Sequence, residues 1–331
     1  MRIKKISVCA IAILLMLSLL TACKEESTEN GETAAKHYTV TFVSGGGTEI
    51  SPKLVKEGTP VDAPDAPEKE GYVFGGWYNG NYEWTFNTAV HEDMTLIAKW
   101  ISPEEVYKHE PTGDGETTVI TGTLQRANIM RLPSQIGGYN VTGIGDGAFK
   151  GVSSEQVSRI VIPESIVSVG DDAFGGCAGI EIIVEGKLTR VGERAFSECD
   201  GLAAVGFGEG LETVSMEAFA STGLRSVTLP KTLKTIDENA FDNCSSLEIV
   251  FIHDGVEAIN DSAFFDTAVV AVYFYGEEAN IAELLENRVF SRNDALTEAR
   301  IYLYSETAPS VDTEFYGFWY FDENNKVKLW K

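Results

Sequence analysis

An Ala-Phe dipeptide recurs along the second half of this chain, and its regular spacing constrains the fold more than any other feature. The intervals between successive copies are 25, 22, 23, 22 and 23 residues. A steady period in this range is typical of a solenoid, in which one unit cannot bury its own apolar face and must stack on the next. We therefore expect each Phe to stack on the Phe of the next rung. The copies are Ala148-Phe149, Ala173-Phe174, Ala195-Phe196, Ala218-Phe219, Ala240-Phe241 and Ala263-Phe264.

A longer pattern surrounds each dipeptide. The units Val157 to Gly179 and Leu224 to Ser246 follow L-x-x-I-x-I-P-x-x-V-x-x-I-x-x-x-A-F-x-x-C almost position by position. This resembles the BspA-type leucine-rich repeat, which implies a mainly β solenoid over 116–275 with an N-terminal cap, followed by a C-terminal cap over 276–331. The unit Ile180 to Gly201 is one residue short, with Glu185 near an apolar position, and we expect its rung to be irregular.

A separate pattern covers residues 38–100. It opens with the alternating strand Tyr38 to Val43, contains G-Y-x-F-x-G-W-Y in its middle, and ends in L-x-A-K-W. It resembles the Listeria–Bacteroides repeat, also called the internalin B-repeat type. The resemblance implies a small β-grasp-like module that acts as a spacer or binds a ligand, with Trp77, Trp84 and Trp100 in its core. Residues 101–115 are polar, with two Pro and two Gly, and we expect a linker there.

The N-terminus predicts export and a lipid anchor. A basic start precedes the apolar run Val8 to Leu20, so residues 1–22 read as a signal peptide. The run ends in Leu20-Thr21-Ala22-Cys23, which resembles the lipobox of bacterial lipoproteins and implies acylation of Cys23. Residues 23–37 then form a flexible tether. We expect a cell-surface protein that is held to the membrane through Cys23.

Composition and motifs argue against nucleic-acid binding and catalysis. The formal net charge is −24, from 26 basic and 50 acidic side chains, and this charge repels phosphate backbones. The four histidines share no metal-binding spacing, no cysteine pair has C-x-x-C spacing, and no nucleophile elbow occurs. We therefore expect no enzyme activity, cofactor or metal. Cys177, Cys199 and Cys244 each follow a repeat Phe by three residues, and we expect a column of small core side chains.

The remaining candidate for function is the sheet on the concave side of the solenoid. The third and fifth residues of each strand should point outward, because side chains alternate across a strand. The candidate ligand site lies at the C-terminal rungs: Ile249, Phe251, His253, Tyr273 and Tyr275. A flanking loop or the C-terminal segment could instead cover this patch. The outward pairs of the six rungs are Arg159 and Val161, Ile182 and Val184, Ala204 and Gly206, Ser226 and Thr228, Ile249 and Phe251, and Ala271 and Tyr273.

Three functions remain open at this stage. The favoured one is adhesion, because proteins with BspA-type repeats are associated with binding host matrix proteins and other bacteria. The second is capture of a glycan or nutrient, which would need exposed Trp or Tyr platforms flanked by polar groups. The third is a purely structural role in the envelope. In each case we expect the chain to act as a monomer.

The Leu20-to-Cys23 box leads to the first prediction. Replacing Cys23 by Ser removes the thiol that would carry the acyl chains, so the protein should leave the membrane fraction. Fractionation of cells that express the Cys23→Ser variant checks this, with a Cys9→Ser variant as the matched control that stays membrane-bound. A Cys23→Ser protein that remains in the membrane fraction with unchanged gel mobility would rule out the anchor.

Overall fold

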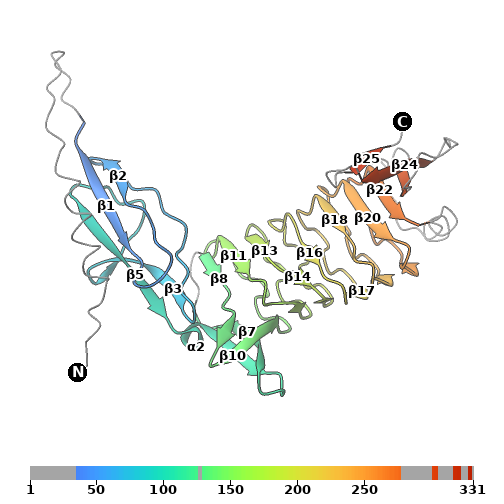
Figure 1. The fold of residues 1–331 in the computed structure, drawn as a ribbon, viewed down its shortest axis with the longest axis horizontal. Coiled ribbons are helices and arrows are strands. Elements are labelled where there is room, and N and C mark those ends of the chain that lie inside the picture. Colours follow the sequence, from blue (N-terminus) through green and yellow to red (C-terminus); the bar gives the residue numbers. More distant parts are fainter. Residues whose placement is uncertain (1–34, 126–128, 277–299, 305–315, 322–326, 330–331) are drawn as a thin grey trace, which may run out of the picture. The chain divides into compact units, whose positions relative to one another are not determined.

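The computed structural model describes residues 35–125, 129–276, 300–304, 316–321 and 327–329, and these are almost entirely β (Figure 1). The four-residue α2 (Pro103–Val106) is the only helix within these ranges. No helix there has the length and apolar character needed to cross a membrane. The expected signal peptide, Cys23, most of the tether and much of the expected C-terminal cap lie outside the described residues.

The N-terminal sheet has five strands in the order β2-β1-β5-β3-β4. Its core follows from the alternation of side chains: in β5, Leu96 and Ala98 are buried whereas Ile97 between them is exposed. The strands are β1 (His37–Val43), β2 (Lys53–Lys56), β3 (Val73–Asn79), β4 (Tyr82–Glu83) and β5 (Met94–Ile101).

Aromatic rings pack together on one side of this sheet, and of the three tryptophans expected in the core only Trp77 is buried, whereas Trp84 and Trp100 are half-buried. Trp77 is only 3% exposed and contacts Phe42 and Phe74 edge-on, with ring centroids 5.0 and 5.5 Å away. Trp100 is half-buried and donates its indole N–H to the carbonyl of Ser44 at 2.7 Å. Its ring lies so close to Gly47 that a Cβ there would come within 2.5 Å of it, so the turn requires glycine.

The expected linker at 101–115 is largely folded. It contains α2 and β6 (Tyr107–Pro111), which pairs antiparallel with β7 (Thr117–Thr123). Val106 and Tyr107 are buried in the solenoid core at 6% and 1% exposure. The polar composition of the segment concealed these two apolar side chains. These two side chains pack against the first rung of the core. β6 forms hydrogen bonds along the edge of β7 that would otherwise lack a partner strand.

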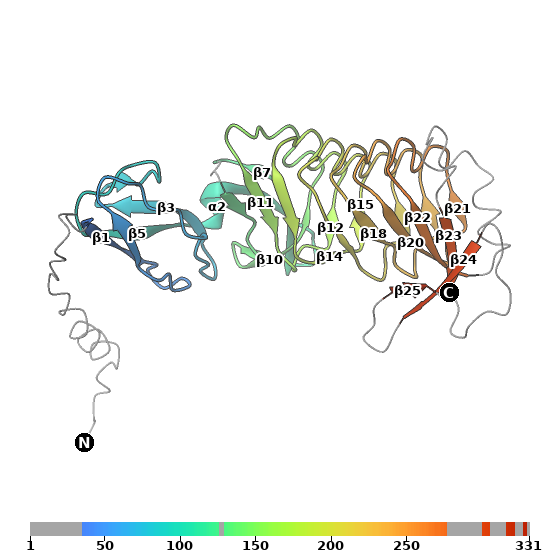
Figure 2. The same cartoon turned by 90° about the horizontal axis from the view of Figure 1, so that it is seen from above.

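The solenoid has two sides made of parallel strands. On each side, strands from successive rungs lie next to one another along the length of the solenoid (Figure 2). On one side are β8 (Ile129–Arg131), β11 (Arg159–Ile162), β13 (Glu181–Val184), β16 (Gly206–Phe207), β18 (Ser226–Thr228), β20 (Ile249–His253), β22 (Ala271–Tyr275) and β23 (Arg300–Tyr304); we call their outward side the strand face. The C-terminal strands β24 (Tyr316–Phe321) and β25 (Val327–Leu329) extend this sheet. The other side contains β10 (Tyr139–Ile144), β12 (Ser168–Val169), β15 (Arg190–Val191), β17 (Thr213–Val214), β19 (Thr235–Ile236) and β21 (Ala258–Ile259). Two further short strands pair locally: β9 (Gln135–Ile136) with β10, and β14 (Lys187–Leu188) with β16.

Around each Ala-Phe the chain makes a tight turn, and the backbone of this turn side forms a ladder between rungs. The amide of each of the first five repeat Phe residues donates to the carbonyl of the next rung's Ala, as in Phe174 to Ala195 at 2.8 Å and Phe219 to Ala240 at 2.9 Å. Two residues per rung adopt a left-handed conformation, one before the Ala and one two places after the Phe. Gly147 and Gly151 occupy these positions in the first rung, and non-glycine residues occupy most of the others: Asp172, Arg194, Glu198, Glu217, Ser221, Asn239, Asn243, Ser262 and Asp266.

The six repeat Phe side chains form one continuous stack inside the turns, which confirms the stacking predicted from the period. Neighbouring ring centroids are 5.1 to 5.5 Å apart and the ring planes differ by 3° to 9°. Each ring is at most 1% exposed. The Ala side chains from Ala173 onward are fully buried beside them, where a larger group would meet the next rung.

The three cysteines fill the column expected of them. All are fully buried and none forms a disulfide, and each thiol donates to the carbonyl of the preceding rung's Phe at 3.0 to 3.2 Å. The hydrogen bond with Cys177 is the largest cause that raises the pKa of the Cys199 thiol, and burial also raises it; burial raises the pKa of Cys244. Cys199 and Cys244 are therefore protonated at neutral pH, and all three cysteines serve as core side chains.

The short rung corrects one part of the sequence interpretation. Ile182 and Val184 were expected to face outward, but Ile182 is 2% exposed and Val184 packs against the core. Glu181 and Ile183 face outward instead and pair with Arg159 and Val161 of the preceding rung. Val161, which was also expected to be exposed, is only 8% exposed. Because side chains alternate with a period of two, a rung that lacks one residue keeps its apolar residues inside by shifting its strand one position. The strand ladder changes partner here: β13 pairs with β11, whereas β16 pairs with β14.

Removing one ring from the stack should destabilise the whole solenoid. Phe219 contacts Phe196, Phe241 and, edge-on, Phe207, and it is fully buried. Phe219→Ala should lower the free energy of unfolding by about 3–5 kcal/mol, as a large-to-small core change. Denaturant unfolding followed by circular dichroism measures this, with the exposed Thr228→Ala as control. A loss under about 1 kcal/mol would contradict the buried stack.

The buried thiols should resist alkylation. In the native protein, iodoacetamide should leave Cys177, Cys199 and Cys244 unmodified, because all three are fully buried and, for Cys199 and Cys244, formation of the reactive thiolate is also suppressed. Peptide mass spectrometry before and after denaturation shows the difference. A Ser226→Cys variant, exposed on the strand face, provides a thiol that should react in both states. Rapid native labelling of the three cysteines would show that the rungs open.

Candidate binding surface

Aromatic side chains gather on the strand face at the C-terminal rungs. The strands β20, β22 and β23 are in register, so Phe251, Tyr273 and Tyr302 form one row and His253 and Tyr275 form a second. We call these five residues the aromatic strip. The alternate residues of the same strands, such as Val250 and Phe274, are buried in the core. This alternation directs the strip residues away from the core.

The rings within each row are stacked. The ring centroids of Phe251 and Tyr273 are 4.8 Å apart and those of Tyr273 and Tyr302 are 5.1 Å apart, with planes within 17° of parallel. His253 and Tyr275 stack at 4.1 Å. All five side chains are half-buried, so the strip is neither covered completely nor fully open to solvent.

The five predicted site residues come together, with Ile249 half-exposed beside the two rows. Two details differ from the prediction. Ala271, which the sequence placed outward, is only 8% exposed. Tyr302 joins the strip although it was not among the predicted site residues. A sequence signal for it existed, since Arg300-Ile-Tyr-Leu-Tyr repeats the alternation of Ala271-Val-Tyr-Phe-Tyr.

The strip is uncharged at neutral pH. Burial, together with the positive charge of Lys231, lowers the pKa of His253 below its usual value, against the opposing effect of Asp254 and Glu209. A lowered pKa keeps the imidazole neutral at pH 7. Burial, and to a smaller extent Tyr302, raises the pKa of Tyr273, so its hydroxyl also stays protonated.

The N-terminal rungs of the strand face differ in chemistry. Their charged side chains are paired: Arg159 contacts Glu181 at 2.6 Å, and Arg131 donates two hydrogen bonds to Glu185, each of 2.8 Å. The middle rungs present only small outward groups. These are Ala204, Gly206, Ser226 and Thr228. A ligand that needs large apolar anchors therefore finds them at the aromatic strip.

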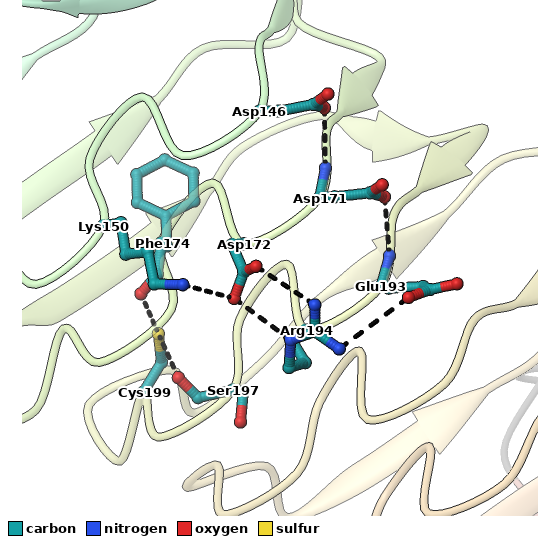
Figure 3. A network of polar contacts seen from close by, with 9 residues as sticks. All are labelled: Asp146, Lys150, Asp171, Asp172, Phe174, Glu193, Arg194, Ser197 and Cys199. Carbon is teal, nitrogen blue, oxygen red and sulfur yellow. Dashed lines mark hydrogen bonds and ion pairs between the residues drawn. The ribbon is translucent and has the colours of Figure 1, made fainter.

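Carboxylates on the turn side have structural partners (Figure 3). Asp146 accepts the backbone N–H of Asp171, and Asp171 accepts that of Glu193, both at 2.9 Å. Asp172 binds Arg194 and Lys150, and the hydrogen bond from Arg194 lowers its pKa. The part of the chain that the structure describes contains no group of three or more His, Cys, Asp or Glu placed to hold a metal ion.

Two tryptophans of the N-terminal sheet, Trp77 and Trp84, do not form an exposed aromatic platform. Trp77 is buried among Phe42 and Phe74, and Trp84 is half-buried. Trp77 could reach a ligand only by leaving its packed position.

The sequence matches known relatives over parts of its length. It is 32% identical over 110 residues to a protein named as a Gly-rich membrane protein of Evansella cellulosilytica, a match that covers 32% of this chain and 13% of the relative. It is 30% identical over 104 residues to internalin H of Listeria monocytogenes, covering 28% of this chain and 19% of the relative. The matches thus span less than a fifth of either relative.

Solved structures are also similar to this chain. A leucine-rich-repeat protein of T. pallidum is 25% identical with a TM-score of 0.48, covering 59% of this chain and 98% of that one. A leucine-rich cell-surface protein of Faecalibacterium prausnitzii is 20% identical with a TM-score of 0.45, covering 68% and 59%. Because both TM-scores are below 0.5, the fold assignment rests on the repeats and strands described above.

Two family models match the chain. The model of the Listeria-Bacteroides repeat domain matches residues 38–99. The model of the BspA-type leucine-rich repeat region matches in six copies over residues 131–184 and 180–297, which together make up about half of the chain. With the stacked Phe column and the in-register strands, this match shows that the chain belongs to the BspA-type leucine-rich-repeat family and carries a Listeria–Bacteroides repeat at its N-terminal end.

Proposed function

We propose that this protein is a non-catalytic, lipid-anchored cell-surface protein that binds a protein ligand through the aromatic strip. The observation that supports this most directly is the two rows of rings on β20, β22 and β23. Half-exposed aromatic side chains in a cluster are typical of interaction surfaces. Because core residues alternate with them, the strip can contact a partner without disturbing the solenoid.

The cell-surface part of the proposal draws on the relatives and on the N-terminus. One relative is named as a membrane protein and another as an internalin, and one similar solved structure is named as a cell-surface protein. The apolar run and the Leu20-to-Cys23 box supply a route to the same location, with Cys23 as the acylated residue. Adhesion to a host matrix protein is then the form of binding that we favour.

The rungs themselves favour recognition over catalysis. The carboxylates at the turns accept backbone N–H groups or pair with Arg and Lys, so they hold one rung to the next. The three thiols are fully buried, and those of Cys199 and Cys244 are held protonated by their raised pKa values. The strip contributes rings with neutral side chains, which bind by contact and hydrogen bonding.

Truncating two rings of the strip should remove the binding site and leave the fold intact. Phe251 and Tyr273 face outward, so Phe251→Ser with Tyr273→Ser should weaken binding more than about tenfold, since aromatic anchors each contribute on the order of 2 kcal/mol. Full-length protein purified in detergent is tested on surfaces coated with fibronectin, fibrinogen, laminin or collagen. Ile183→Ser, which removes an apolar side chain from the same outward column, is the matched control.

Each outcome of that experiment is informative. Normal folding with lost matrix-protein binding supports the proposal. Normal folding with unchanged binding would show that the binding site lies outside the aromatic strip. The N-terminal sheet would then be the next surface to test. Binding to a glycan array, but to no protein surface, would favour the glycan-capturing alternative. Circular dichroism of both variants verifies that they are folded.

A further inference from the structure

The geometry of the aromatic strip restricts the chemistry of its ligand. The ring of Tyr273 lies between those of Phe251 and Tyr302, and the rings of His253 and Tyr275 face each other. The planes within each row are within 17° of parallel. The ring faces are therefore turned toward one another along the solenoid. What they present to a partner is mainly ring edges and tyrosine hydroxyl groups.

Flat stacking of a sugar does not fit this arrangement. A pyranose binds an aromatic residue by laying its C–H groups on the ring face. To enter between two rings it needs about twice the van der Waals contact distance of ~3.5–4.0 Å. The ring centroids within the rows are only 4.1 to 5.1 Å apart. Ring edges and hydroxyl groups suit a polypeptide better, because they contact apolar side chains and exchange hydrogen bonds with its backbone.

The charges around the strip indicate the sign of the ligand. The strip is neutral, and the charged groups that act on His253 are Glu209, Asp254 and Lys231, two negative and one positive. The whole chain carries a formal charge of −24. Such a field draws basic partners toward the surface and repels acidic ones, including sialylated or sulfated glycans.

We propose that the ligand of the aromatic strip is a polypeptide segment that bears both apolar and basic side chains. Its apolar side chains contact the ring edges of the two rows. Its Lys or Arg residues lie toward Glu209 and Asp254. This inference rests on the proposed binding function and deepens it by naming the chemistry of the partner.

The test compares defined probes on the unchanged protein. Short synthetic peptides of alternating Lys and Val, Glu and Val, or Lys and Ser are measured by fluorescence anisotropy against the full-length chain in detergent, beside a neutral cello-oligosaccharide. The Lys-Val peptide should bind at least about tenfold more tightly than each other probe, and its affinity should fall as salt is added. Equal binding of the Glu-Val or Lys-Ser peptide, or tighter binding of the oligosaccharide, overturns the inference.

Two variants locate the interaction. Phe251→Ser with Tyr273→Ser leaves the net charge unchanged, so binding through the overall acidic field would persist, whereas binding at the strip should fall by about tenfold or more. The double change Glu209→Gln and Asp254→Asn should weaken binding of the Lys-Val peptide and reduce the dependence of its affinity on salt. Ile183→Ser should change neither the affinity nor its salt dependence. If the aromatic variant fails to fold, the comparison of probes on the unchanged protein still decides.

The result also separates this inference from the proposed function. If matrix-protein binding depends on Phe251 and Tyr273 but the peptides bind alike, the surface is correct and its proposed selectivity is wrong. If the Lys-Val peptide binds equally well to the aromatic variant, and matrix proteins do too, both proposals fail.

Discussion

The structure depends on the ladder at the turn side, where each repeat Phe is fixed in two ways. Its amide donates to the next rung's Ala carbonyl, and its ring stacks on the next Phe. Both contacts need the same rung spacing, so backbone and side chains support one geometry. The left-handed residues at each turn are unfavourable for most side chains, and they are tolerated because their amides also bond to the next rung, as Arg194 does with Met216.

This ladder explains how the solenoid tolerates an imperfect rung. Between Ile180 and Gly201 the strand shifts by one residue and changes its pairing partner, yet Phe174, Phe196 and Phe219 remain stacked. The turn side thus sets the rise from rung to rung, while the strand side adjusts to keep apolar residues inside. Variation in length or chemistry is therefore accepted on the strand face, which is where a binding surface can develop.

The same division of labour accounts for the charge distribution. Acidic side chains at the turns bond to backbone amides of the next rung, as Asp146 and Asp171 do, and so contribute to the ladder as well as to the charge of −24. On the strand face the charged residues of the N-terminal rungs are paired and the C-terminal rungs are aromatic. An acidic protein thereby carries an aromatic strip of neutral side chains on its strand face.

The period of the Ala-Phe dipeptide was by itself enough to predict the solenoid, the Phe stack and the buried cysteines, because these follow from stacking equal units around one core. The alternation of strand residues likewise predicted that Phe251 and Tyr273 face outward. The alternation of residues 300–304 also carried a signal for Tyr302, whose place in the strip was missed. Two features were decided only by tertiary packing: the shifted register of Glu181–Val184 and the burial of Val106 and Tyr107. Each depends on what a residue meets from a distant part of the chain. A one-residue shift exchanges the two faces of a strand. The strand adopts the register in which its apolar side chains are buried in the core.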